Sequence, residues 1–154
     1  MTRIVATRQH VVQAGEAFDG LLHRVVVLNR LFGAAGEQLA RPAGQTLARY
    51  LVLREADNDP APVAEIARRL RLTRQGVQRI ADVLAADGLA EYVDNPRHQR
   101  AKLVQPTRAG RKALEQIIDA QREWAQRLGP QVGRDKLERA NALLDEVLRV
   151  VEED

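Results

Sequence analysis

Four polar side chains share one face of a short predicted helix near the middle of the chain. The apolar residues of this segment recur at helical spacing, which turns four of them toward a core: Val77, Ile80, Ala81 and Leu84. The side chains left outside near the start of the helix are Arg74, Gln75, Gln78 and Arg79. Arginine pairs bidentately with guanine, and glutamine with adenine, in the major groove of DNA. This face therefore has the chemistry to read base edges, although solvated surface positions would carry the same residue types.

A second short helix and a tight turn precede this face. We expect the first helix over residues 63–70, a turn at Arg71 and Leu72, and a cap at Thr73, whose hydroxyl can accept from backbone amides two or three residues on. The start of the second helix also offers free N–H groups and a positive dipole to a phosphate. The pattern predicts a helix-turn-helix, in which the second helix enters the major groove.

A basic hairpin is predicted after the helix-turn-helix. Asp87-Gly88 ends the second helix, residues 89–93 and 101–105 form the expected strands, and residues 94–100 form the tip. The tip and the second strand carry Arg97, His98, Arg100 and Lys102. Cationic side chains on a thin tip suit a narrow, electronegative minor groove or the phosphates. The alternative is a mobile exposed loop, which would itself be polar.

The charge of the chain is unevenly distributed. The net charge is +3, but residues 63–112 hold eleven Lys or Arg against five Asp or Glu, a balance of +6. Residues 113–154 hold six basic and ten acidic residues, a balance of −4. Basic charge is thus concentrated where binding of double-stranded DNA would need phosphates to be neutralised. Charge that only solvates helices is the alternative.

Several other classes of protein find little support in the composition. The chain has no cysteine, and His10, His23 and His98 lie far apart, so we expect neither a metal site nor a thiol switch. No Ser-His-Asp set, glycine-rich phosphate loop or HExxH run is present, so we expect no catalytic residues and no cofactor. The apolar runs are too short to span a membrane, and no targeting segment is visible. We therefore expect a cytoplasmic protein without a membrane partner.

Long amphipathic helices are predicted on both sides of the helix-turn-helix. Apolar residues in segments 21–39 and 134–151 alternate steps of four and three. Between them, segment 108–128 is expected to bury a face that includes Gln121, Trp124 and Leu128 and to stop at Gly129-Pro130. These stripes are wider than a small domain could bury, so we expect the outer helices to interleave with those of a second copy. An intramolecular helical bundle is the alternative.

Two groups of short motifs stand out in these elements. The first is Ala64-Glu65-Ile66-Ala67, and the second comprises Gly88-Leu89 through Asn95-Pro96, Arg100-Ala101 and Thr107-Arg108-Ala109-Gly110. The first is similar to the first reader helix, and the second to the wing, of the MarR (multiple antibiotic resistance regulator) family of bacterial transcription factors.

The resemblance implies a fold class and a division of the chain. The fold is mainly α with a small β-hairpin wing, in a single domain over residues 1–154. A winged helix-turn-helix lobe would cover residues 45–110, and residues 16–44 and 111–154 would form the helical dimerisation lobe. The resemblance also implies that Thr73, at the start of the second helix, contacts DNA.

The resemblance also implies a function, namely a homodimeric, sequence-specific, DNA-binding repressor that recognises a pseudo-palindromic operator. Family members often respond to a small organic effector bound between the dimer helices and the reader lobe. His23, Tyr50 and Trp124 are candidates to line such a site, although each could be ordinary core or surface. A protein-interaction module without sequence-specific DNA binding is the competing reading.

Three positions depart from the family pattern. Pro62 stands where the first reader helix usually begins with Thr or Ser, and Tyr92 stands where an arginine is common. His98 replaces the aspartate that usually lies two residues before the arginine matched by Arg100. We hypothesise that protonated His98 donates to a phosphate, so that affinity falls as the pH rises through its titration range. An unchanged pH dependence in a His98→Ala variant would dispose of that hypothesis.

Overall fold

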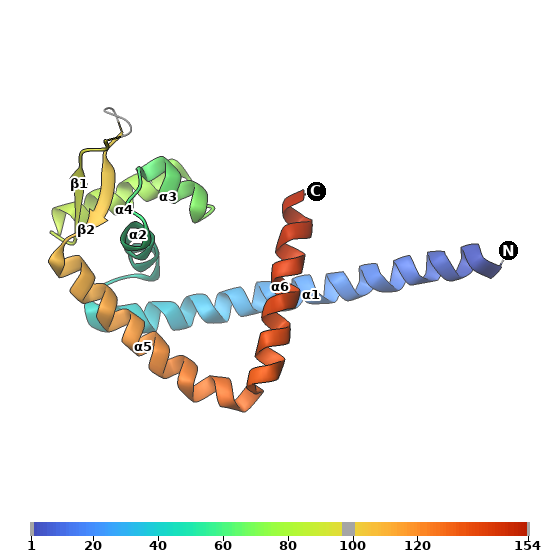
Figure 1. The fold of residues 1–154 in the computed structure, drawn as a ribbon. Helices are drawn as coiled ribbons and strands as arrows, with labels where there is room; N and C mark the ends of the chain where they lie inside the picture. Colours follow the sequence, from blue (N-terminus) through green and yellow to red (C-terminus); the bar gives the residue numbers. More distant parts are fainter. Residues whose placement is uncertain (1, 97–100, 154) are drawn as a thin grey trace. The chain divides into compact units, whose positions relative to one another are not determined.

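The fold is that of a computed structural model, which describes residues 2–96 and 101–153 (Figure 1). The chain forms two compact units, Met1–Leu47 and Ala48–Asp154. Within the described residues, no helix is long and apolar enough to cross a membrane.

The first unit consists mainly of one long helix. Helix α1 (Thr2–Ala40) begins well before the predicted stripe and is followed by a 3-10 turn, η1 (Arg41–Ala43). Gly44 ends the turn with φ at 69°, a left-handed conformation that glycine adopts without steric cost. Its N–H bonds to the carbonyl of Arg41 at 2.9 Å, which closes the turn.

The second unit contains the helix-turn-helix. Helices α2 (Leu47–Asn58), α3 (Val63–Arg69) and α4 (Arg74–Ala86) follow one another through short loops. A proline-rich loop, residues 59–62, ends the first of these helices. One residue of that loop, Ala61, makes a bridge to the hairpin, because its carbonyl accepts from the N–H of Val104 at 3.0 Å. This bridge ties the loop before α3 to the base of the wing.

The wing is a two-stranded antiparallel sheet. Strands β1 (Ala90–Val93) and β2 (Leu103–Pro106) pair in the register Ala90↔Pro106 to Val93↔Leu103. The second strand begins two residues later than predicted. Pro106 occupies its last position, where the missing N–H costs no interior ladder bond.

Every helix and strand of the second unit except α6 contributes buried side chains to its core. Its largest fully buried side chains come from α2, α3, α4, β2 and α5: Leu53, Ile66, Leu84, Leu114, Ile117, Val52, Val77, Val104 and Pro106. The predicted inner face of α4 is confirmed at Val77, Ala81 and Leu84. Ile80 is only half-buried, so the buried stripe of α4 is narrower than predicted.

The predicted end of the long helix at Gly129-Pro130 is wrong. Helix α5 (Arg108–Val132) continues through Pro130 and ends at Gly133, where φ is 97°. Proline lacks one N–H, but a single missing bond in the last turn is tolerated there because only a few residues follow. Leu128 and Gln121, predicted on a buried face, are exposed, and Trp124 is half-buried. Helix α6 (Arg134–Glu153) departs from α5 after this turn (Figure 1) and has no buried residue.

Candidate nucleic-acid interface

The start of α4 is shaped by its cap. Thr73 has extended backbone angles, and its Oγ1 accepts from the N–H of Gly76 at 3.1 Å, as predicted from the sequence. Arg71, in the turn before it, has φ at 55°, an uncommon value for a residue other than glycine. The N–H of Leu72 bonds to the carbonyl of Ala67 at 2.9 Å, which fixes the turn to α3. The first turn of α4 is therefore held at a defined angle to the preceding helix.

Three of the residues predicted to contact DNA bases lie on the solvent-exposed side of α4. Arg74, Gln75 and Arg79 are exposed, while Val77, Ala81 and Leu84 on the opposite side are completely buried. Among the described residues, the structure records neither a hydrogen-bond nor an ion-pair partner for these three exposed side chains. Two guanidinium groups and one amide are thus available to an outside partner at the positive end of the helix.

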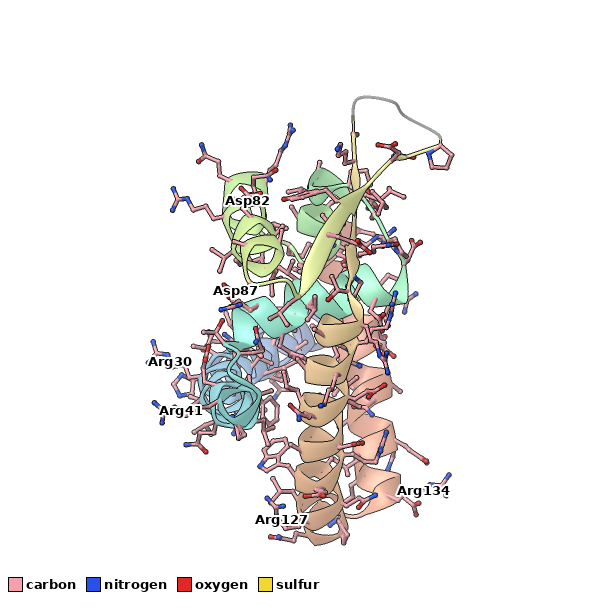
Figure 2. The ribbon with its side chains drawn as sticks, turned by 90° about the vertical axis from the view of Figure 1, so that its left-hand side faces the viewer. Arg30, Arg41, Asp82, Asp87, Arg127 and Arg134 are labelled. Carbon is pink, nitrogen blue, oxygen red and sulfur yellow. The ribbon has the colours of Figure 1, made fainter. Side chains whose placement is uncertain are left out.

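Gln78 differs from its neighbours because it already has partners. It is half-buried, and its Nε2 donates to Oδ1 of Asp82 at 2.9 Å and to the phenolic oxygen of Tyr92 at 2.8 Å. The Tyr92 hydroxyl donates to the same Asp82 oxygen at 2.7 Å. We call these three residues the Gln78 trio. Figure 2 shows Asp82 on α4, beside the hairpin.

Two pKa values are shifted within the Gln78 trio. The bonds from Tyr92 and Gln78 lower the pKa of Asp82, because they stabilise the carboxylate. Partial burial, followed by the bond to Asp82, raises the pKa of Tyr92 to about 12. At neutral pH the trio therefore contains a carboxylate, a neutral phenol and an amide.

Sequence reasoning missed the Gln78 trio. The spacing of Gln78 and Asp82 was a usable signal, because an amide and a carboxylate four residues apart meet on a helix. Tyr92 gave no such signal, since only the packing of β1 against α4 brings it close.

The wing is described only at its base. Gln105 donates to Glu91 at 2.9 Å across the two strands, and Lys102 is exposed just before β2. Arg97, His98 and Arg100 lie outside the described residues, so their predicted contacts and the His98 hypothesis stay predictions.

An ion-pair cluster joins α3 to the loop before it. Arg69 bonds to Asp59 at 2.5 Å and to Glu65 at 3.0 Å, and it lies 3.4 Å from Glu55. Glu65 also accepts from Arg68, at 2.6 Å. Bonds from Arg68, and then from Arg69, lower the pKa of Glu65 to about 2. These arginines are engaged within the fold, in contrast to those on α4.

The three candidate effector residues have different surroundings. Tyr50 is buried, and its hydroxyl donates to Gln121 at 2.8 Å and accepts from Arg54 at 2.5 Å. Trp124, on α5 in the same unit, is half-buried. His23 is exposed on α1, in the first unit. Within the described part of the chain, no group of three or more His, Asp or Glu residues could hold a metal ion.

A helix-turn-helix followed by a two-stranded hairpin, with free cationic side chains at the start of its second helix, defines a winged helix-turn-helix protein. A model of the MarR family matches residues 43–101. Uncharacterized proteins of Mycobacterium tuberculosis and Mycobacterium bovis are 39% identical over 99 residues, covering 64% of this chain and 69% of the relative. The chain belongs to the MarR family, whose members are transcription regulators and not enzymes.

Solved structures share the fold at low sequence identity. MarR of Staphylococcus aureus, in complex with salicylate and kanamycin, is 13% identical, with a TM-score of 0.79 over 88% of this chain and 93% of that one. A mutant MarR of E. coli complexed with operator DNA is 22% identical, with a TM-score of 0.72 over 82% of this chain and 93% of that one. These likenesses support the predicted fold class, mainly α with a β-hairpin wing.

Proposed function

We propose that this protein is a sequence-specific DNA-binding transcriptional repressor that reads the major groove with α4. The observation that carries the proposal is the exposed set of Arg74, Gln75 and Arg79, which have no recorded partner within residues 2–96 and 101–153, on a helix whose opposite side is fully buried. A rigidly mounted helix with free guanidinium and amide groups can pair with base edges. Lys102, with Arg97, His98 and Arg100 of the wing, would add contacts to the minor groove and phosphates. Because the proposed target is the chromosome, we place its action in the bacterial cytoplasm.

The proposed regulator works as a homodimer on a pseudo-palindromic site. Large apolar side chains are exposed on α1 and α6, and they include Leu22, Leu31, Phe32, Leu144 and Leu148. Isolated exposed leucines are ordinary, but several large apolar side chains exposed along each of two helices favour a protein partner. A second copy would cover them and would present α4 twice, on half-sites about one turn of DNA apart. We assign residues 16–44 and 111–154 to this dimerisation lobe and residues 45–110 to the reader lobe, within a single domain.

A small organic effector is the proposed regulator of DNA binding. The S. aureus relative binds salicylate, and a ligand that prefers one spacing of two readers would shift the DNA equilibrium by its difference in affinity. His23, Tyr50 and Trp124 stay our candidates to contact such an effector.

The test of DNA reading is selection of bound duplexes from a random pool, followed by titration of the selected site. The wild-type protein is expected to enrich one motif and to bind it with an affinity that falls steeply with salt. Arg74→Ala and Arg79→Ala should each weaken binding to that site by about 10-fold or more. Arg122→Ala removes one exposed charge from α5 and should leave affinity nearly unchanged. Binding without discrimination among sequences would instead favour a protein-interaction module.

A further inference from the structure

Both hydrogen bonds of the Gln78 side-chain amide are made by its nitrogen. Its Nε2 lies 2.9 Å from Oδ1 of Asp82 and 2.8 Å from the phenolic oxygen of Tyr92. A primary amide has two N–H donors and one carbonyl acceptor. Both donors are therefore occupied inside the protein, and only the carbonyl oxygen is left for another partner.

The chemistry of the partners fixes this orientation of the amide. The Asp82 carboxylate can only accept, so the amide nitrogen and not its oxygen must face it. The Tyr92 hydroxyl has a single proton, which it donates to Asp82 at 2.7 Å, and it therefore accepts from Gln78. Rotating the amide by half a turn would place its oxygen against a carboxylate oxygen and would lose both bonds.

The trio spans two elements, so the orientation depends on the packing of the wing. Gln78 and Asp82 both lie on α4, whereas Tyr92 lies on β1, where it pairs with Val104 of β2. Gln78 and Tyr92 are half-buried, which shields their bond from water, while Asp82 is exposed on the helix surface. The base of the wing thus controls a side chain of the reading helix without having to contact DNA itself.

We propose that Tyr92 is a positioning residue that determines which base Gln78 reads. The inference rests on the proposed DNA-reading function of α4. With its N–H groups engaged, Gln78 presents only an acceptor, which suits an exocyclic amino group in the major groove: N6 of adenine or N4 of cytosine. The bidentate pairing of glutamine with adenine needs an amide N–H as well and is unavailable. Guanine and thymine present acceptors at this edge and are disfavoured.

The experiment compares base preferences of four proteins by selection from a random duplex pool. Wild-type protein should prefer adenine or cytosine by about 10-fold at one position facing each α4, in line with one hydrogen bond made or left unmade. Tyr92→Phe frees one N–H, so Gln78 can donate as well as accept: cytosine should lose its advantage over guanine and thymine, to about 2-fold, while adenine, now open to bidentate pairing, should gain over cytosine, with other positions and the salt dependence unchanged. Asp82→Asn, which no longer dictates the amide orientation, should relax the same position. Gln105→Ala breaks a side-chain bond between the same two strands and should keep the wild-type preference.

A second comparison separates positioning from direct contact. In a Gln78→Ala background, adding Tyr92→Phe should change nothing further, because Tyr92 acts through Gln78. A further change of preference in that background would mean that Tyr92 touches DNA itself, and it would overturn the inference.

The remaining outcomes are also decisive. An unaltered preference in a folded Tyr92→Phe protein would refute positioning. If that variant fails to fold by circular dichroism, an unaltered preference in Asp82→Asn refutes it instead. Failure of the wild-type protein to select any motif would refute the proposed function, which is a different result.

Discussion

Thr73 and Thr107 cap their helices with the same geometry, but within the part of the chain that the structure describes only Thr107 has a second partner. Each hydroxyl oxygen accepts from the N–H three residues on at 3.1 Å. The Thr107 hydroxyl also donates to the carbonyl of Gly88 at 2.7 Å, which joins the start of α5 to the turn after α4. We expect Thr73→Ala to cost about 1 kcal/mol and Thr107→Ala about 2 kcal/mol. Urea denaturation measures both, and equal losses would show that the second bond adds nothing.

Gly110 is required by a close approach of α5 to the backbone that leaves α4. A Cβ added at Gly110 would lie 1.9 Å from the carbonyl oxygen of Leu89, which also accepts from the N–H of Thr107. Backbone cannot move aside as a flexible side chain would, so we expect Gly110→Ala to destabilise the fold by about 3 kcal/mol. Gly15→Ala is the control, because nothing lies within 4 Å of the added atom. Equal denaturation midpoints for the two variants would contradict this account.

At the residue scale, the sequence predicted the positions that depend on local geometry. The cap at Thr73 and the burial of Val77, Ala81 and Leu84 follow from residues close by in the sequence, and the structure confirms them. The partners of Gln78 could not be predicted in full. Tyr92 is fourteen residues away, and its approach depends on how the hairpin packs against α4.

At the element scale, α3 is attached to the preceding loop by charged groups. The pKa of Glu65 is lowered to about 2 by Arg68 and Arg69, so the folded state holds the carboxylate more strongly than the unfolded chain does. The stability that this provides is complete above the ordinary pKa of a glutamate and is lost as the pH falls through about 2.

Glu65→Gln should remove that pH dependence. We expect the variant to unfold at a lower temperature than wild type at pH 7, because it loses both charged partners. We expect the two melting temperatures to converge as the pH falls from 4.5 toward 2. Thermal unfolding followed by circular dichroism across this range is the measurement. A constant difference between the two proteins would mean that the carboxylate contributes nothing through its charge.

The ends of elements were harder to predict than their existence. All the predicted helices and both strands are present, and α6 follows its predicted bounds closely. The end of α5 was predicted wrongly because a proline usually marks a helix boundary, whereas here the helix ends at Gly133, whose φ of 97° suits glycine. The bridge from Ala61 to β2 had no sequence signal, since a single paired residue produces no periodicity.

At the scale of the whole molecule, a single chain leaves much apolar surface on its outer helices. The amphipathic pattern of α6 was visible in the sequence, but the helix has no buried residue in the structure. Burial depends on what a helix packs against, and the sequence pattern does not specify whether that is the same chain or another copy. In the proposed dimer, one partner would cover the exposed leucines of α6 as well as the exposed valines and phenylalanines of α1.

Leu148→Asp tests the dimer directly. Leu148 is 60% exposed, so an aspartate there should leave the isolated chain folded and should disrupt an apolar contact with a second copy. Analytical ultracentrifugation should then find a folded monomer, whereas the wild type should sediment as a dimer. Val83→Asp places the same charge on an exposed valine of α4 and should remain dimeric. A dimeric Leu148→Asp protein would contradict an interface that includes this face of α6.

The same variant links assembly to DNA binding. Two readers on one dimer bind a palindromic site with the second contact made intramolecularly, which raises affinity by about 100-fold or more over a single reader. Leu148→Asp should therefore weaken binding to the selected palindrome by about that factor, although α4 and its side chains are unchanged. On a single half-site the variant and the wild type should bind alike, because only one reader is engaged there. Equal affinity of the monomeric variant and the dimer for the palindrome would mean that each α4 acts alone and that pairing serves another purpose.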